Sequence, residues 1–214
     1  MTGPSPDFDA VFRGHLADLL AWRRDVRRFR PDPLDEGQLD RLLDLACLAP
    51  SVGLSQPWRF VSVESTAARA GVVAAFEQAN AEALADYGGE RAALYARLKL
   101  AGLREAPVHL AVFCDQATGQ GHGLGRRTMP EMLAYSVVTA VHTLWLVARA
   151  EGIGVGWVSI LDPQAVATVL AVPPDWRLVA YLCIGHPLAD QAEPELARAG
   201  WQARDSRCRD VLRR

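Results

Sequence analysis

Two stretches of the chain decide the fold and the site that we expect: Trp22-Arg-Arg-Asp-Val-Arg-Arg-Phe29 and Ser51-Val-Gly-Leu-Ser-Gln-Pro-Trp58. They lie on either side of one amphipathic segment. The first begins a run of five arginines, at positions 23, 24, 27, 28 and 30, with a single acid, Asp25, among them. A guanidinium group is a planar fork of donors that matches phosphate oxygens. The first stretch therefore predicts a site for a phosphorylated ligand.

The second stretch adds Ser51, Ser55 and Gln56, whose neutral donors and acceptors suit the edge of a planar heterocycle. A run of arginines is more often a solvated face or a nucleic-acid surface. Here, however, 23 Lys and Arg residues are balanced by 25 Asp and Glu residues, and the net charge is -2. No global positive field attracts a polyanion, so we expect a small anionic ligand and no nucleic acid.

Length and composition favour one domain over residues 1–214, because 214 residues of which 50% are hydrophobic can bury a large core. The first six residues lack a secretory pattern, so we expect a cytoplasmic protein. The most apolar stretch, residues 132–148, is interrupted by hydroxyl groups and a histidine, which favours a buried helix and no membrane span. Neither the four cysteines nor the five histidines have metal-binding spacing, so we assign no metal and no disulfide.

The hydrophobic periodicity predicts helices that alternate with strands. Helices are expected over residues 8–21, 35–50, 66–84, 90–102, 128–150 and 162–170, and strands over 58–63, 107–114, 154–160 and 177–184. This alternation implies an α+β or α/β sandwich. The polar, arginine-rich tail over roughly 188–214 predicts an arm, which lies over a partner chain or over the same fold, and an arm favours a dimer.

A glycine-rich segment, residues 119–125, has four glycines in seven positions but lacks the pattern of a nucleotide-binding loop. We interpret it as a mobile cover over a neighbouring site or as an ordinary surface loop. Asp25 is either a local ion-pair partner of Arg24 or Arg28, or a proton-transfer group beside a bound ring. Ser159 is either an ordinary strand hydroxyl or part of the site.

Several longer motifs share their order with a known family. They are Arg23-Arg-Asp-Val-Arg27, the 51–58 stretch, Leu98-Lys-Leu-Ala-Gly-Leu-Arg-Glu-Ala-Pro107, Gly121-His-Gly-Leu-Gly-Arg126 with Thr128-Met-Pro-Glu131, and Gly154-Val-Gly-Trp-Val-Ser-Ile160. Through them the chain resembles, over roughly residues 15–204, the nitroreductase-fold flavoproteins, and among these the BluB type, the 5,6-dimethylbenzimidazole synthases.

The resemblance implies an α+β fold: a nitroreductase-like α/β sandwich with a central mixed sheet flanked by helices, in an intertwined homodimer. Flavin mononucleotide (FMN) is then bound at the interface by residues of both chains. The resemblance places Asp25 and Ser159 in catalysis, as the acid/base and as a hydrogen-bonding partner. The flavin-binding residues that it implies are Arg23, Arg24, Asp25, Val26, Arg27, Ser51, Gly53, Ser55, Gln56, Leu100 and Ser159.

The activity that the resemblance implies is the O2-dependent fragmentation of reduced FMN to 5,6-dimethylbenzimidazole, the lower ligand of vitamin B12, with release of a four-carbon sugar phosphate. FMN is then the substrate, and NAD(P)H acts indirectly through a separate flavin reductase. The first alternative is an NAD(P)H-dependent nitroreductase or flavin reductase of the same fold. The second is a flavin carrier without catalytic activity, in which Asp25 only balances charge.

Overall fold

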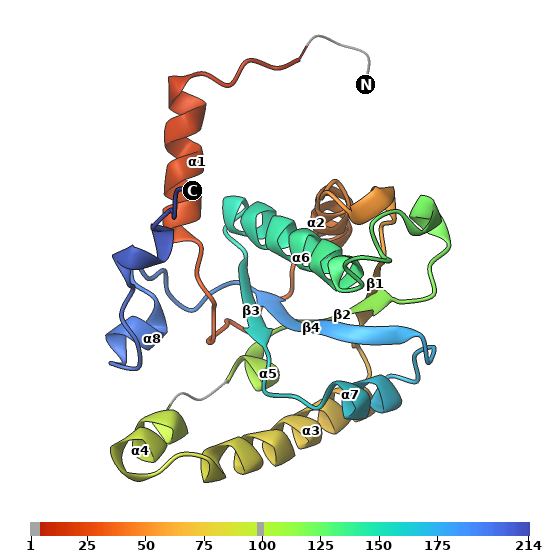
Figure 1. Cartoon of the computed structure of the whole chain (residues 1–214). Coiled ribbons are helices and arrows are strands. Elements are labelled where there is room, and N and C mark those ends of the chain that lie inside the picture. The colour runs from red at the N-terminus through yellow and green to blue at the C-terminus, as the bar shows by residue number, and fades with distance from the viewer. Residues whose placement is uncertain (1–4, 98–100) are drawn as a thin grey trace.

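A four-stranded sheet forms the centre of the computed structural model, which describes residues 5–97 and 101–214 (Figure 1). The strands are β1 Trp58–Ser62, β2 Val108–Asp115, β3 Gly154–Val158 and β4 Trp176–Gly185. Their order is β1-β2-β4-β3, and every neighbouring pair is antiparallel. The α+β class is confirmed.

The prediction of a mixed sheet is wrong for these four strands. Helical connections between strands favour parallel pairing, but the long connection through the helices between β1 and β2 returns the chain in the opposite direction. Within the described residues, the parallel pairing is an isolated bridge between Asp25 and Val155.

Eight α-helices and three short 3₁₀ helices are described. The α-helices are α1 Ala10–Trp22, α2 Gln38–Ala46, α3 Thr66–Ala85, α4 Gly89–Arg97, α5 Gly102–Glu105, α6 Met132–Ala150, α7 Pro163–Val169 and α8 Glu195–Arg198. The 3₁₀ helices are η1 Val52–Leu54, η2 Gln120–Gly123 and η3 Ser206–Arg209. The predicted elements are all present with shifted ends, and part of the helix expected over 90–102 lies outside the described residues.

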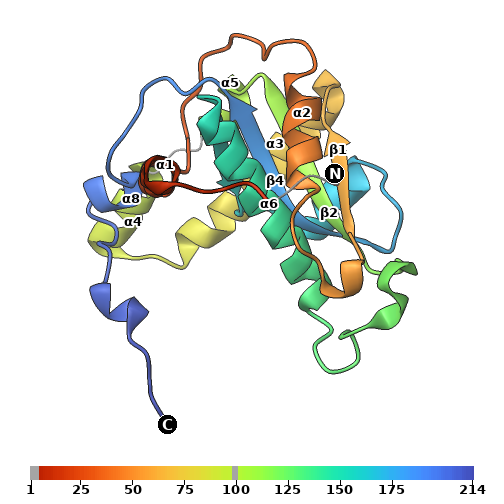
Figure 2. The same cartoon turned by 90° about the horizontal axis from the view of Figure 1, so that it is seen from above.

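Each face of the sheet carries its own core (Figures 1 and 2). Alternate residues of a strand point to opposite faces, and β2 follows this rule: Leu110 and Val112 pack with α2 and α6, whereas Ala111 and Phe113 pack with α3 and α7. The molecule is therefore a sandwich of helices, sheet and helices.

Two helices begin later than the sequence suggests. The Gln38 side chain accepts a hydrogen bond from the Asp35 N–H at 3.3 Å, as in a capping box, but the N-cap of α2 is Gly37, whose φ is 68°. Similarly, α6 has Glu131 at its N-cap, so Thr128 does not cap it. In both cases the polar residue of the expected cap lies in the preceding turn.

Helix α6 is, among the described residues, the one helix that is long and apolar enough to cross a membrane. Its apolar character has a second explanation in this fold. Val137, Ala140, Val141 and Leu144 are fully buried and belong to the core between α6 and the sheet. The prediction of a buried core helix is confirmed.

Helix α1 projects from the body of the molecule (Figure 1). None of its residues is buried. Its hydrophobic residues Val11, Phe12, Leu16 and Leu20 are all exposed, as is Trp22 at its end. An exposed apolar face of this kind is typical of surfaces that bind a protein, a ligand or a membrane.

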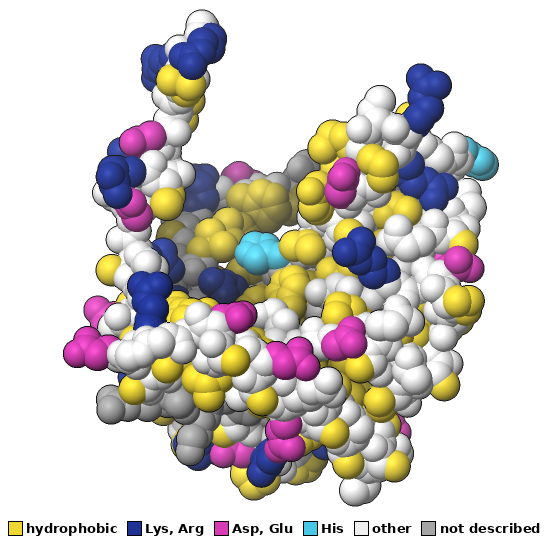
Figure 3. Space-filling view, turned by 60° about the horizontal axis from the view of Figure 1, so that its bottom comes forward, with side chains coloured by type: hydrophobic (Ala, Val, Ile, Leu, Met, Phe, Trp, Pro, Cys, Tyr) yellow, Lys and Arg dark blue, Asp and Glu magenta, His cyan; other side chains and the backbone are white. Residues whose placement is uncertain are grey.

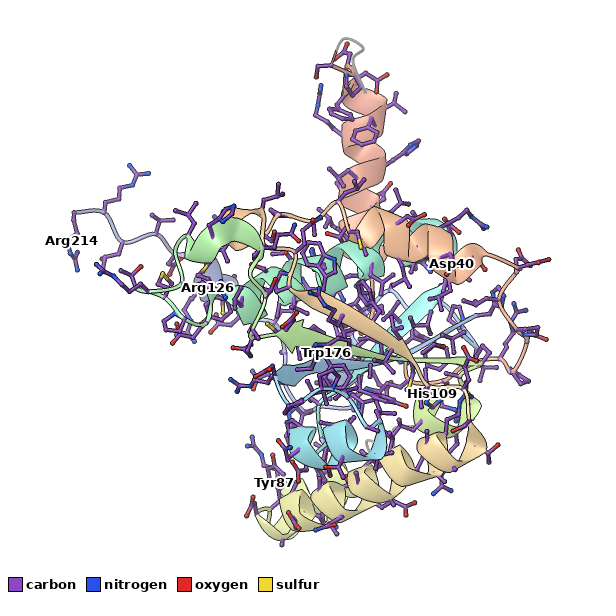
Figure 4. All side chains as sticks on the ribbon, turned by 90° about the vertical axis from the view of Figure 1, so that its right-hand side faces the viewer. Asp40, Tyr87, His109, Arg126, Trp176 and Arg214 are labelled. Carbon is purple, nitrogen blue, oxygen red and sulfur yellow. The ribbon has the colours of Figure 1, made fainter. Side chains whose placement is uncertain are left out.

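A buried polar pair lies between the sheet and α3, where His109 is labelled in Figure 4. His109 is 2% exposed, and its Nδ1 lies 2.9 Å from the hydroxyl of Tyr181. Burial lowers the pKa of His109 to about 4, and the positive charge of Arg69 acts in the same direction. His109 is therefore neutral at pH 7 and becomes charged in the folded protein only at acid pH.

This burial predicts an acid-sensitive fold. Unfolded histidine has a pKa of about 6.5, so the unfolded chain binds the proton first, and stability decreases as the pH falls from about 6.5 to about 4. We expect His109 to account for a loss of about 2 kcal/mol between pH 7 and pH 5. Urea unfolding at both pH values checks this.

The His109→Gln variant should lose that part of the pH dependence even if its stability at pH 7 is lower than that of the wild type. His142→Gln, at an exposed position of α6, is the control. An unchanged pH dependence in His109→Gln contradicts the assignment.

Candidate functional site

The segment that carries Asp25 is attached to the open edge of β3. The Val26 N–H donates to the carbonyl of Val155 at 3.1 Å, and the Trp157 N–H donates to Oδ1 of Asp25 at 2.9 Å. A backbone bond and a side-chain bond thus hold the segment in register with the strand. Asp25 is positioned by the sheet and does not move with a loop.

Two glycines of β3 allow this attachment. A Cβ at Gly156 would lie 2.1 Å from the carbonyl oxygen of Val26, and a Cβ at Gly154 would lie 2.9 Å from a methyl group of the same residue. Neither position accepts a larger side chain without displacement of the Val26 segment. The Gly-Val-Gly sequence of the strand is therefore a requirement of the site.

The Asp25 carboxylate has two different partners. Oδ1 accepts from Trp157, and Oδ2 accepts from Nε of Arg27 at 3.2 Å. The ion-pair partner is therefore Arg27, whereas the sequence suggested Arg24 or Arg28. The Asp25 side chain remains 36% exposed, so both oxygens are oriented while the carboxylate stays accessible.

Two of the five arginines, Arg28 and Arg30, form ion pairs with acidic residues outside the cluster. Nε of Arg28 donates to Glu105 at 2.9 Å, and Arg30 pairs with Asp32 at 3.3 Å. Each of these two arginines has an acidic partner outside the cluster, so the prediction that all five arginines donate to a ligand stays a prediction, and Arg28 and Arg30 would first have to release these partners.

The remaining arginines line a small cavity that we call the basic pocket. It is lined by Arg23, Arg24, Asp25, Arg27, Pro194, Glu195, Leu196 and Arg204, and its volume is about 140 Å³. Arg204 is not among the residues that the sequence motifs assign to the site. The signal was present, because the predicted arm is arginine-rich and folds back over the first arginine stretch.

The charges in the basic pocket favour an anion. Burial lowers the pKa of the Arg24 guanidinium, and the positive charges of Arg204, Arg23 and Arg149 lower it further. Within the described residues, Nε of Arg24 is buried without a hydrogen-bond partner. A phosphate group here would supply both the missing acceptor and the missing negative charge, so these residues fit the phosphate of FMN.

An aromatic wall lies next to the basic pocket. The Trp145 ring lies 4.8 Å from the guanidinium of Arg23, and its Nε1 donates to the Arg24 carbonyl at 3.0 Å. Trp145 also lines a second cavity of about 190 Å³, together with Asp25 and Val155. No sequence motif points to Trp145, because its contacts depend on where α6 crosses the arginine segment.

The second predicted stretch forms a tight loop around η1, which we call the serine loop, residues 51–56. Oγ of Ser51 accepts from the Gln56 N–H at 3.1 Å. Gly53, Leu54 and Gln56 all have positive φ, of 57°, 55° and 40°. Ser55 is 2% exposed, and within the described residues its hydroxyl has no partner.

The structure does not bring the serine loop and the basic pocket together within one chain. Val52 donates to Oγ of Ser136 near one end of α6, whereas Trp145 contacts Arg24 near the other. Positions 136 and 145 are about two and a half turns apart, or about 14 Å along the axis, and face opposite directions. Figures 1 and 2 show α6 between the two regions.

The other predicted residues have different positions. Ser159 is exposed and follows the end of β3, so it is not a strand residue. It lies two positions after Trp157, or about 7 Å along the chain direction. Leu100 lies outside the described residues. Residues 5–97 and 101–214 contain no group of three potential metal ligands.

The glycine-rich segment packs against the serine loop. A Cβ at Gly121 would lie 2.7 Å from the carbonyl oxygen of Gly53, and a Cβ at Gly125 would lie 2.8 Å from Val52. The glycines thus allow close approach of two backbones and place the segment against the serine loop, and its role as a mobile cover stays a prediction. The segment continues to Arg126, labelled in Figure 4.

Comparison with known proteins agrees with this fold and with the motifs. The sequence pattern described as the Nitroreductase family matches residues 20–186. A solved structure of oxidized iodotyrosine deiodinase, bound to FMN and 3-iodo-L-tyrosine, has a TM-score of 0.72 and 25% identity, and the match covers 93% of this chain and 97% of that one. The chain belongs to the nitroreductase family.

Two relatives within this family are closer in sequence. A 5,6-dimethylbenzimidazole synthase of Rhodospirillum rubrum is 60% identical over 213 residues, with 100% of this chain and 99% of the relative covered. A 5,6-dimethylbenzimidazole synthase of Rhodobacter capsulatus is 53% identical over 196 residues, with 92% and 95% covered. The resemblance predicted from the motifs is confirmed.

Substitution of the two glycines of β3 should lower the free energy of unfolding by different amounts, with Gly156 the more sensitive position. Gly156→Ala places a methyl group against a backbone oxygen, which cannot move alone, and we expect a loss of about 2–3 kcal/mol. Gly154→Ala meets only side-chain atoms of Val26 and should cost less. Gly88→Ala, where a Cβ meets nothing within 4 Å, is the control. Urea unfolding of the three variants measures the order, and equal stabilities would contradict the close contact.

Proposed function

We propose that this chain is an oxygen-dependent oxidoreductase that converts reduced FMN to 5,6-dimethylbenzimidazole, with release of a four-carbon sugar phosphate. The relatives at 60% and 53% identity support this reaction class. The observation that carries the proposal is the carboxylate of Asp25, which is oriented by Trp157 and Arg27 at the margin of the basic pocket.

The basic pocket binds the phosphate of FMN in this proposal. Arg23, Arg24 and Arg27 supply the donors, Arg204 adds a fourth guanidinium, and the buried Nε of Arg24 gains an acceptor. The aromatic wall at Trp145 lies beside the donors and suits a planar group. The iodotyrosine deiodinase structure, which holds FMN, supports a flavin as the ligand of this fold.

Asp25 acts as the acid/base. Its oxygens each accept one hydrogen bond and each retain a lone pair, so the carboxylate can take a proton from the reacting ring and return it without rotating. Ser159, beyond the end of the same strand, supplies a hydroxyl that both donates and accepts. Bound FMN supplies the ring that is cleaved, and the protein residues orient it and move protons.

A second copy of the chain completes the site. The two cavities that Asp25 lines measure about 140 and 190 Å³, below the roughly 300–1,000 Å³ of pockets that enclose a cofactor. The serine loop of the same chain lies on the far side of α6. The exposed face of α1 and the hollow lined by hydrophobic and basic side chains (Figure 3) are consistent with an intertwined homodimer, to which the 188–214 arm contributes.

Reduced FMN comes from a separate flavin reductase that uses NAD(P)H, and we place both proteins in the cytoplasm. The chain thus receives its electrons already stored in its substrate.

The Asp25→Asn variant tests the reaction. The protein is mixed anaerobically with chemically reduced FMN, air is admitted, and 5,6-dimethylbenzimidazole is measured by chromatography with mass detection. Loss of a positioned acid/base typically lowers a rate by about 10²–10⁴-fold, and we expect a loss in this range. Binding of oxidised FMN should change little, because the basic pocket is retained.

The other functions give different outcomes in the same assay. Simple reoxidation of FMN by the wild type, with sustained NAD(P)H turnover on nitroaromatic compounds, identifies a reductase. Reoxidation without such turnover identifies a carrier. Equal product from Asp25→Asn and the wild type removes Asp25 from the chemistry.

Mixed dimers test the shared site. One chain carries Arg23→Ala and Arg24→Ala, the other carries Ser51→Ala and Ser55→Ala, and each set alone should be inactive. If each site takes one region from each chain, random mixing in a two-fold dimer restores about a quarter of the wild-type activity. Sites contained within single chains restore none.

A further inference from the structure

Gln120, at the start of η2, connects the glycine-rich segment to the serine loop. Its Nε2 donates to the carbonyl of Leu54 at 3.1 Å and to Oε1 of Gln56 at 2.9 Å. One amide group thus contacts both the backbone and a side chain of the serine loop. Gln120 is not among the residues to which the sequence motifs assign a role.

The bond to Leu54 determines how both amides are oriented. A backbone carbonyl only accepts hydrogen bonds, so the Gln120 atom that faces it must be the nitrogen. The second hydrogen of the same nitrogen then requires an acceptor, and Gln56 provides its oxygen. The two hydrogen bonds of Gln120 therefore determine which atom of the Gln56 amide is the oxygen and which is the nitrogen, starting from the Leu54 carbonyl.

As a consequence, Gln56 presents donors to its surroundings. Its oxygen is occupied by Gln120, and within residues 5–97 and 101–214 its side-chain nitrogen donates to no other group. The residue is only half-buried, so its NH2 group remains accessible. A donor in this position recognises an acceptor.

The backbone conformation of the serine loop depends on the same contacts. Leu54 and Gln56 have φ of 55° and 40°, in the left-handed region that residues with a Cβ rarely adopt. Such conformations persist where neighbouring groups hold them, and they concentrate at binding sites. Gln120 holds the Leu54 carbonyl, and Ser51 holds the Gln56 N–H.

We propose that Gln120 is a positioning residue that fixes Gln56 as a hydrogen-bond donor toward an acceptor edge of the bound flavin ring, a carbonyl oxygen or an imine nitrogen. This inference rests on the proposed function, because it takes the flavin as the ligand. It adds a polarity to that site: at Gln56 the serine loop donates to one acceptor atom of the ring edge.

The variant that tests this proposal most directly is Gln120→Glu, because it keeps the shape of the side chain and removes its hydrogen-bond donors. The carboxylate repels the Leu54 carbonyl and attracts the NH2 group of Gln56, so the Gln56 amide turns and presents its oxygen to the ligand. Loss of one donor and its replacement by an acceptor should raise the Kd for oxidised FMN about tenfold.

A double-mutant cycle with Gln56→Ala tests whether Gln120 acts through Gln56. Kd is measured for each single variant and for the double variant by quenching of flavin fluorescence. In the Gln56→Ala background, Gln120→Glu should change Kd less than about twofold. Gln164→Glu makes the same chemical change at an exposed position of α7 and should bind as the wild type does. Urea unfolding confirms that each variant is folded.

Riboflavin separates the ring from the phosphate. Gln120→Glu should weaken riboflavin and FMN by the same factor, because it acts at the ring, whereas Arg24→Ala should weaken only FMN. A purely structural defect in the loop would also lower the free energy of unfolding of Gln120→Glu, which the urea measurement detects.

A wild-type Kd for FMN in Gln120→Glu overturns the inference, as does an equal loss in the presence and absence of Gln56. Failure of the proposed function is distinguishable, because it appears in the wild type as FMN binding without formation of 5,6-dimethylbenzimidazole. Absence of flavin binding by the wild type overturns both.

Discussion

The attachment of the Asp25 segment to the open edge of β3 is the contact on which the site depends. The Val26 N–H donates to the Val155 carbonyl, and the Trp157 N–H donates to the Asp25 carboxylate. These two bonds fix the position of the carboxylate along β3. The same segment delivers Arg23, Arg24 and Arg27 to the basic pocket. This close approach requires glycine at positions 154 and 156 of β3, because a side chain there would collide with Val26. The strand therefore lacks side-chain packing at these two positions.

Helix α6 contributes to the hydrophobic core and also separates the serine loop from the basic pocket. One of its faces packs on the sheet, one of its ends supports the serine loop through Ser136, and the other contacts the arginine segment through Trp145. Because the helix is rigid, the separation of the two binding regions in one chain is fixed. In the proposed function the flavin contacts both regions, and such a ligand requires two chains.

Much of this was predictable from the sequence. Periodicity located nearly every element, because apolar residues repeat with the period of the structure that they bury. Strand direction was not predictable, since the 107–114 pattern is the same in a parallel and in an antiparallel neighbour. The pairing of Arg28 with Glu105 was not predictable, because the two residues lie 77 positions apart in the sequence. Trp145 and Gln120 were missed, because each acts on residues distant in sequence.

Helix α1 leaves a row of large apolar side chains in water when the chain is alone. Burial of such a row on association makes the folded population depend on protein concentration by mass action. If the homodimer that we propose forms, newly made chains at low concentration possess neither a covered surface nor a completed site. For an enzyme that consumes a coenzyme needed elsewhere in the cell, this dependence would act as a safeguard, because an isolated chain would leave FMN intact.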